Sequence, residues 1–529
     1  MTRLQLKFSR TQALMGLFIL GFIVRLIPEI LAYPYPISWD MIHYAYFMRT
    51  GIVWEHWSSF FTSSWLLYAF IFPIHNQLGV DSFLLLKITG PILFGFNTCG
   101  VYWFAKSLLN WETKKSFLAA GLFSFQLASL RISFDLLRNT LGLGLLLFTL
   151  LLIKRLESKR CFTAFTLLSL LTIFAHEYAA VTLLAVSLVI VLKGLINKKD
   201  GKETRVPKRL TVAILPALIV FLAGVYLRAV PISYGPPRAV GPNLIWVNDT
   251  SLQSYGTLFF FVNYLGMNTG SDIYPNYLFL VLSVLTLFAL LYLSYIYLVW
   301  RGFFRNEILD TWTMLLLVGS FGCLITPFFA LDLWHRWMFM LVYPFTFYAV
   351  NGAETLLSQM PQHRTMRGKF RIKNKVSVMV LVTVLLGAIY LATPFLMVHV
   401  GFGIYSLYPT SRYFSSAPTV PFQDIDGTIS AMHWLKDNMH RNSCAVLQNA
   451  FATWAKLYLE NSQNVIAYIN DVDLAVNLAL QNNYQNIYFV CWNKEIGWYG
   501  TYVPKNFDEL PNCSFGRISV FEYVGDRVG

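Results

Sequence analysis

The sequence predicts an α-helical polytopic membrane protein that ends in a small α/β domain. Of its 529 residues, 56% are hydrophobic and only 13% are charged, and its mean hydropathy is +0.52. Soluble domains carry about a quarter of their residues as charged side chains. Long apolar runs recur through residues 1–400, whereas residues 401–529 have the mixed composition of a soluble domain. We therefore expect a transmembrane domain at 1–400 and an extracytoplasmic α/β domain at 401–529.

The positive charge follows the topology of a membrane protein. The net charge is +14, and the basic residues gather in short loops between apolar runs, at 114–115, 154–160, 193–209 and 364–375. Cytoplasmic loops carry an excess of Lys and Arg, so this pattern places the N-terminus in the cytoplasm and the C-terminal domain outside. It explains the basic composition without a nucleic-acid partner. We expect the protein to lie in a prokaryotic plasma membrane rather than in the endoplasmic reticulum.

About eleven apolar segments predict transmembrane helices, at roughly 20 residues for each crossing. A shorter run at 65–73 ends near Pro73 and His75. If it crossed the membrane, every later basic loop would lie outside, so we expect it to lie on the outer face. An outer segment rich in Pro, Gly and Asn is expected at 231–276. The expected spans cover residues 11–32, 83–105, 117–130, 139–153, 162–175, 178–192, 210–227, 277–300, 312–330, 337–350 and 376–399.

Short helical and extended segments alternate in the C-terminal region. Such alternation predicts a small layered unit with a largely parallel sheet. The region lacks a G-x-G-x-x-G loop, so nucleotide binding has no support. Helices are expected at 428–439, 451–460 and 471–481, and strands at 444–448, 465–469, 487–492 and 517–523.

Ionisable side chains collect in four connections that the charge pattern places on the outer face. An ionisable group at membrane depth is costly and is a candidate for function by default. The convergence of four connections on one face therefore predicts a single site. The candidates are Asp40 after the first span, Asp135 and Arg138 in the second outer turn, His176 and Glu177 in the third, and His335 and Arg336 before the tenth span.

Each candidate also has a structural interpretation. Asp40 could cap the helix that follows it. Asp135 and Arg138, three residues apart, could form only a local pair. His176 could be a buried, hydrogen-bonded helix end, and Arg336 could be an interfacial anchor beside tryptophans. The sequence H-E-Y lacks the second His of H-E-x-x-H, which disfavours a zinc protease.

These residue types suit the transfer of a sugar from a lipid phosphate. A carboxylate activates the acceptor, as a general base or through a divalent ion, and a cation holds the departing phosphate. We expect Asp40 and Asp135 as catalytic residues, with Mg²⁺ or Mn²⁺ left open as a cofactor. The expected partners are a lipid-linked sugar donor, a glycan, lipid or protein acceptor, and membrane lipid. The expected substrate-binding residues are Arg138, His176, Glu177, His335 and Arg336.

Three motifs, taken in order, resemble the GT-C superfamily of polytopic glycosyltransferases. They are P-Y-P-I-S-W-D at 34–40, F-D-L-L-R-N at 134–139 and H-R-W at 335–337. The soluble domain after the last span is similar to the arrangement in oligosaccharyltransferase catalytic subunits. The resemblance implies a polyprenyl-phosphate-linked sugar donor. It also implies that Asp40 and Asp135 occupy the places of the family's two acidic motifs.

Two departures from the family pattern narrow the expected reaction. The first outer loop has one Asp instead of paired acids, and the W-W-D-Y-G signature is absent from 401–529. We therefore expect transfer of a single sugar to a lipid- or protein-linked acceptor on the extracytoplasmic face. The alternatives are a transporter or flippase of lipid-linked sugars and a non-catalytic membrane scaffold. Catalysis requires Asp40, Asp135 and Arg336 to lie together.

Overall fold

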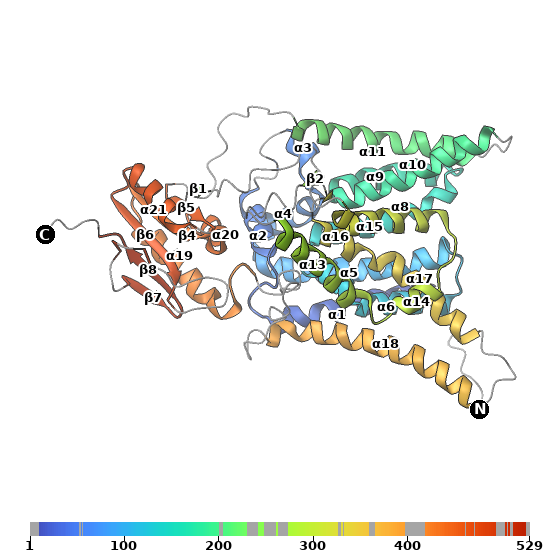
Figure 1. Ribbon diagram of the computed structural model, residues 1–529. Coiled ribbons are helices and arrows are strands. Elements are labelled where there is room, and N and C mark those ends of the chain that lie inside the picture. Colours follow the sequence, from blue (N-terminus) through green and yellow to red (C-terminus); the bar gives the residue numbers. More distant parts are fainter. Residues whose placement is uncertain are drawn as a thin grey trace.

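The chain forms a bundle of long helices with a smaller α/β unit at one end (Figure 1). It is therefore an α-helical polytopic membrane protein with a small C-terminal α/β domain, as the composition predicts. The computed structural model describes residues 10–51, 54, 57–199, 205–229, 242–247, 261–262, 273–325, 330–331, 333–358, 366–396, 418–460, 462–469, 471–493, 503–504, 506–507 and 511–524.

Seven helices in the described part of the chain are long and apolar enough to cross a membrane. Their apolar length matches the roughly 30 Å hydrocarbon core of a bilayer. Each coincides with one of the spans expected from hydropathy. They are α1 (Arg10–Leu31), α5 (Ser82–Ser107), α8 (Leu137–Leu152), α10 (Glu177–Lys199), α11 (Arg205–Ala229), α15 (Glu307–Ile325) and α18 (Met366–Phe395).

The other expected spans coincide with helices that are shorter, interrupted or bent. The pair α6 (Thr113–Phe125) and α7 (Leu127–Asp135) bends by 60° and counts as an eighth span if it is read as one. The remaining three spans correspond to α9 (Lys159–Ala175), to α13 (Ile273–Tyr292) with α14 (Ile296–Arg301), and to α16 (Trp334–Met340) with α17 (Val342–Ser358).

A buried glutamine marks the bend between α6 and α7. The hydroxyl of Tyr295 donates a hydrogen bond to Gln126 Oε1 at 2.7 Å, and the hydroxyl of Ser129 donates to the Gln126 carbonyl at 2.7 Å. The Ser129 hydroxyl also donates to the Phe123 carbonyl near the end of α6, where the break interrupts the regular helical hydrogen bonds. The sequence predicts a single apolar segment here, because its apolar pattern continues through the break. The bend carries α7 into the protein, where all of its residues are buried.

Helices α1 and α5 pack closely and fix the start of the first outer connection. A Cβ atom added at Gly95 of α5 would lie 2.8 Å from the carbonyl oxygen of Phe18 in α1. Small residues allow such close approach between membrane helices. The connection after α1 contains α2 (Met41–Thr50), α3 (Ser59–Thr62) and α4 (Leu66–Leu78). Helix α4 covers the run at 65–73, and its place on the outer face stays a prediction.

The C-terminal unit is a six-stranded sheet in the order β1-β5-β4-β6-β8-β7. The first four strands in this order are parallel, and β8 pairs antiparallel with both β6 and β7. The largely parallel sheet is thus confirmed. The strands are β1 (Asn243–Val247), β4 (Ser443–Gln448), β5 (Asn464–Tyr468), β6 (Asn486–Trp492), β7 (Cys513–Phe515) and β8 (Ile518–Glu522), and the helices are α19 (Ile425–Asn438), α20 (Asn449–Tyr458) and α21 (Val472–Gln481).

The edge strand β1 comes from the segment between α11 and α13, which the sequence assigns to the membrane domain. It pairs with β5 over five residues, from Asn243 with Asn464 to Val247 with Tyr468. The six-stranded sheet therefore combines strands from two distant parts of the chain. The expected boundary near residue 400, and most of the outer segment 231–276, lie outside the described residues. A second, two-stranded sheet joins β2 (Phe261–Val262) to β3 (Ala330–Leu331).

Helix α20 of the sheet unit lies against the first outer connection (Figure 1). Thr453 Oγ1 lies 3.4 Å from His43 Nε2, and the rings of Trp454 and Phe83 are 6.4 Å apart. Burial lowers the pKa of His43 to about 4, and the nearby charge of Lys456 acts in the same direction. The sheet unit thus contacts the helix that begins one residue after Asp40.

Candidate functional site

Asp40 lies directly before α2, but its side chain does not cap that helix. Its backbone has φ −75° and ψ −11°, and its carboxylate makes no capping hydrogen bond. A capping Asp accepts from the backbone N–H groups of the first turn. The capping interpretation is therefore wrong, and 27% of the side chain remains exposed.

Arg336 is distant from Asp40 in the sequence but faces it in the structure. The distance from Arg336 Nη2 to Asp40 Oδ2 is 3.9 Å, and 24% of the arginine side chain is exposed. Trp334 and Trp337 beside it are each only 1% exposed. They belong to the core and not to an interfacial aromatic belt, so the anchor interpretation of Arg336 loses its support.

The backbone before Arg336 adopts an uncommon conformation. Leu333 has φ +51°, in the left-handed region that a leucine seldom occupies. The N–H group of Arg336 donates to the Leu333 carbonyl at 2.7 Å and begins α16. Such conformations concentrate at functional sites, where the surrounding structure maintains them.

Asp135 is buried at the end of α7 and pairs with Arg131, four residues earlier. The local pair with Arg138 considered from the sequence is not the partner found. Asp135 nevertheless lies within electrostatic reach of Asp40. Burial raises the pKa of Asp40, the charge of Asp135 raises it further, and the charges of Arg336, Arg138 and Arg131 oppose the rise.

Arg138 lies in the first turn of α8, beside the helix that follows Asp40. Its guanidinium carbon lies 5.9 Å from the ring centroid of Tyr44 in α2. Its Nε atom is buried and has no hydrogen-bond partner among the described residues. A buried guanidinium N–H without an acceptor is costly, and an anionic ligand would satisfy it. Arg138 thus has donor capacity for a substrate.

His176 occupies the break between α9 and α10. The backbone N–H of Tyr178 donates to His176 Nδ1 at 3.2 Å, so a neutral ring carries its proton on Nε2. The ring packs at 5.0 Å against Tyr178, which in turn lies 5.0 Å from Trp337. His176 is therefore a buried, hydrogen-bonded helix end whose other nitrogen can still donate.

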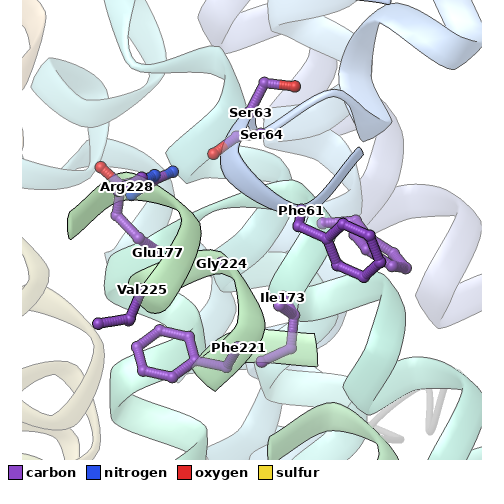
Figure 2. A pocket seen from close by; sticks show the side chains of 10 residues that line it. Phe61, Ser63, Ser64, Ile173, Glu177, Phe221, Gly224, Val225 and Arg228 are labelled. Carbon is purple, nitrogen blue, oxygen red and sulfur yellow. The ribbon is translucent and has the colours of Figure 1, made fainter. Parts of the chain in front are cut away.

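Glu177 lines a small pocket at the same end of the bundle (Figure 2). Its Oε2 atom lies 3.7 Å from Arg228 Nη2, and Arg228 also donates to the carbonyl of Thr62. The hydroxyls of Ser63 and Ser64 and several aromatic and aliphatic side chains complete the wall. Hydroxyl, carboxylate and guanidinium groups beside apolar surface suit a small ligand rich in hydroxyl groups.

Arg228 is a member of the site that sequence reasoning missed. It follows directly after the expected span 210–227, where an arginine reads as an ordinary interfacial anchor. Its pairing with Glu177 joins residues that are far apart in the chain, so no local pattern signals it. His335 lies beside Arg336 in α16, and its ring packs edge-on against Trp334 and Phe339, each at 5.8 Å.

The structure brings most of the expected residues into one electrostatic cluster. Arg138 and Arg336 lie within reach of both Asp40 and Glu177, and so connect the two halves of the site. The cluster holds more guanidinium groups than carboxylates. Its members are Asp40, Asp135 and Glu177 as acids, Arg131, Arg138, Arg228 and Arg336 as cations, and His176.

The residues present fit an anionic ligand better than a metal ion. No three His, Cys, Asp or Glu side chains in the described ranges lie close enough to hold one. Asp135 is paired with Arg131, and Asp40 faces Arg336. Mg²⁺ and Mn²⁺ prefer oxygen ligands without competing cations. We therefore assign no step to the divalent ion that the sequence left open.

Several proteins of known structure are similar to this chain. ArnT from Cupriavidus metallidurans in the apo state matches with 10% identity and a TM-score of 0.47, covering 91% of this chain and 93% of that chain. The arabinofuranosyltransferase AftD from Mycobacteria matches with 13% identity and a TM-score of 0.46, covering 98% of this chain and 42% of that chain. At these identities and TM-scores the likenesses assign no family to this chain and no role to any of its residues. No protein-family model and no curated protein matches the sequence.

Proposed function

We propose that this protein is a membrane glycosyltransferase that moves a sugar from a polyprenyl-phosphate-linked donor to a lipid- or protein-linked acceptor on the extracytoplasmic face. The observation that most supports this function is the meeting of Asp40 and Arg336, 3.9 Å apart, within a cluster rich in arginine. A partly exposed carboxylate that caps no helix is available as a base. The surrounding guanidinium groups supply the positive charge that a phosphate leaving group needs.

In the proposed reaction, Asp40 accepts the proton of the acceptor hydroxyl as the acceptor oxygen bonds to C1 of the sugar. The bond between C1 and the phosphate oxygen breaks, and its electron pair leaves on the polyprenyl phosphate. The raised pKa of Asp40 makes its carboxylate a stronger base than an exposed one. Asp135 acts on Asp40 through its charge and holds Arg131 in place.

Arg336 and Arg138 are the groups proposed to bind the donor phosphate. The planar guanidinium fork matches two phosphate oxygens, and Arg138 has a buried Nε–H without a protein acceptor among the described residues. Binding of the phosphate also compensates the excess of positive charge in the cluster. The pocket of Glu177, Arg228, Ser63 and Ser64 is proposed to receive the sugar or the acceptor.

The buried ionisable groups between α1 and α5 do not favour the transporter alternative. Arg25 and Glu29 form a pair at 2.8 Å, and Lys87 donates to the carbonyl and carboxylate of Glu29 at 2.9 and 3.3 Å. Ionisable groups that pair with one another in this way hold the two helices together. A transport path instead needs polar groups open to a passing substrate.

The test is transfer by the purified protein in lipid vesicles. The protein is incubated with a panel of radiolabelled polyprenyl-phosphate sugars and a membrane extract as the acceptor source, and loss of label from lipid is measured. Asp40→Asn, which keeps the size of the side chain, should lower the rate by about 100-fold or more. Asp473→Asn, at an exposed position of α21, is the matched control and should leave the rate unchanged.

Two results would reject the proposal. If the Asp40→Asn variant transfers sugar at the full rate, Asp40 is not the base. Movement of labelled lipid across the vesicle membrane without cleavage of the sugar–phosphate bond would instead identify a transporter.

A further inference from the structure

A second pocket lies at the opposite end of the helix bundle from Asp40. It has a volume of about 280 Å³. Along α1, the rise from Ala13 to Leu31 is about 27 Å at 1.5 Å per residue, close to the thickness of the hydrocarbon core. The wall is formed by α1, by α5 and the turn after it, by α6, and by the short 3-10 turn η2 (Ile153–Arg155). The lining residues are Ala13, Tyr102, Lys106, Ser107, Asn110, Thr113 and Arg155.

The lining of this pocket is cationic and rich in hydrogen-bond donors. Lys106 and Arg155 supply positive charge, and Tyr102, Ser107 and Thr113 supply hydroxyl groups. No acidic side chain lines it, and neither cation forms an ion pair with an acid of the described residues. This differs from Lys115 in the same loop region, which is paired with Glu354 and with Asn351. The two unpaired charges are therefore available to an anion.

The apolar surroundings of the pocket indicate that its anionic ligand is a lipid. Phe117 and Leu118 of α6 are 45% and 49% exposed. Phe117 stands one helical turn after Thr113 and so lies on the same face of α6. These side chains present apolar surface where acyl chains would run. Basic pockets between membrane helices at the cytoplasmic interface bind anionic headgroups in this way.

We infer that this pocket binds the phosphate headgroup of an anionic membrane lipid in the leaflet opposite Asp40. Lys106 and Arg155 pair with the phosphate, and the hydroxyl groups of Ser107 and Thr113 donate to its oxygens or to the glycerol. The bound lipid joins the ends of α1, α5 and α6 to η2. The inference does not depend on the proposed transfer reaction, because no residue of the pocket belongs to the candidate site.

The experiment counts lipids bound to the full-length protein by native mass spectrometry. The probes are phosphatidylglycerol, which is anionic, and phosphatidylcholine, which is zwitterionic. The variant Lys106→Gln/Arg155→Gln should bind one phosphatidylglycerol fewer than the parent, or bind it at least tenfold more weakly. The matched control Lys159→Gln/Arg160→Gln removes the same charge from exposed residues of the same basic region and should bind as the parent does.

A second variant tests the space of the pocket separately from its charge. Thr113→Phe fills the space and keeps both cations, and it should also lose one phosphatidylglycerol. Thermal unfolding without added lipid identifies any variant that is misfolded.

The ligand source is tested by adding inorganic phosphate. If phosphate displaces no lipid, the ligand is the headgroup of an intact lipid and not a free phosphate. If phosphate binds the parent but not the Lys106→Gln/Arg155→Gln variant, and lipid binding is equal in both, the lipid assignment is overturned in favour of a soluble phosphate compound. Equal binding of every probe by the parent, the variant and the control would overturn the pocket itself.

Discussion

The carboxylate of Asp40 takes its chemical character from neighbours that are distant in the sequence. Burial and the charge of Asp135 raise its pKa, whereas three arginines oppose the rise. An isolated aspartate has a pKa of about 3.9. Asp40 is therefore a stronger base than an exposed aspartate, yet it lies beside cations that can hold a phosphate.

This balance predicts the pH dependence of the transfer reaction. Asp40 must be ionised to accept a proton, so kcat/KM should fall as the pH drops through its raised pKa. The acid limb should lie at a higher pH than that of an ordinary carboxylate. Arg336→Gln removes a charge that lowers the pKa of Asp40, so the limb should move to still higher pH. The measurement is kcat/KM against pH for the parent and the variant.

The control for this shift is Arg301→Gln, which removes an exposed arginine at the end of α14. It should change neither the limb nor the maximum. An acid limb that stays in place in Arg336→Gln would contradict the assignment of Asp40 as the titrating base.

At the scale of elements, α7 is held in place by α1. The Arg25 guanidinium donates from Nε to the Ser133 carbonyl at 3.0 Å and from Nη2 to the Phe134 carbonyl at 3.3 Å. It therefore satisfies carbonyl groups at the end of α7 and fixes the residue that follows, Asp135. Glu29 keeps Arg25 in this position and also pairs with Lys87. The network connects the core of the bundle to the candidate site.

Removing different members of this network should have unequal effects on stability. Glu29→Gln leaves Arg25 and Lys87 buried without their counter-charge and should lower the free energy of unfolding by about 3–5 kcal/mol. Lys87→Met keeps the pair of Arg25 with Glu29 and should cost about 1 kcal/mol. Unfolding in mixed micelles, followed by tryptophan fluorescence, measures both. Equal losses in the two variants would show that Glu29 does not balance two cations.

The sequence predicts the elements well and their junctions poorly. Apolar runs of about 20 residues identify the long helices because the bilayer sets their length. At the bend, Gln126 accepts a hydrogen bond from the hydroxyl of Tyr295, and β1 pairs with a strand beginning at Asn464. No local pattern contains either contact. Similarly, the charge pattern places Asp40 and Arg336 on one face, but only the packing of α16 brings them within 3.9 Å.

At the scale of the whole molecule, the sheet unit and the membrane bundle meet at α2 and α20. The guanidinium of Arg49 lies 5.6 Å from the ring centroid of Tyr458 and 5.7 Å from that of Phe83. It also donates to the hydroxyl of Ser82 at 3.2 Å. Because α2 begins directly after Asp40, this contact connects the sheet unit to the helix beside the candidate base.

A double-mutant cycle tests this coupling. Arg49→Met and Tyr458→Leu should each destabilise the protein, and the double variant should lose less than their sum, by about 0.5–1 kcal/mol. The measurement is thermal unfolding of the four proteins. Additive losses would mean that the two side chains do not interact and that the domains are held elsewhere.

The orientation of the molecule in its membrane decides which compartment the candidate site faces. Helix α2, which begins directly after Asp40, and the sheet unit lie at one end of the bundle (Figure 1), and the basic loops that lead into α6 and α9 lie at the other. The excess of Lys and Arg in those loops predicts that they face the cytoplasm. Asp437→Cys, at an exposed position of α19, should react with an impermeant maleimide in intact cells, whereas Arg160→Cys should react only after permeabilisation. The unsubstituted chain, labelled in parallel, corrects for native Cys161 beside position 160. The reverse pattern would place the arginine-rich cluster against the cytosol, and a donor presented on the extracytoplasmic face could not reach it.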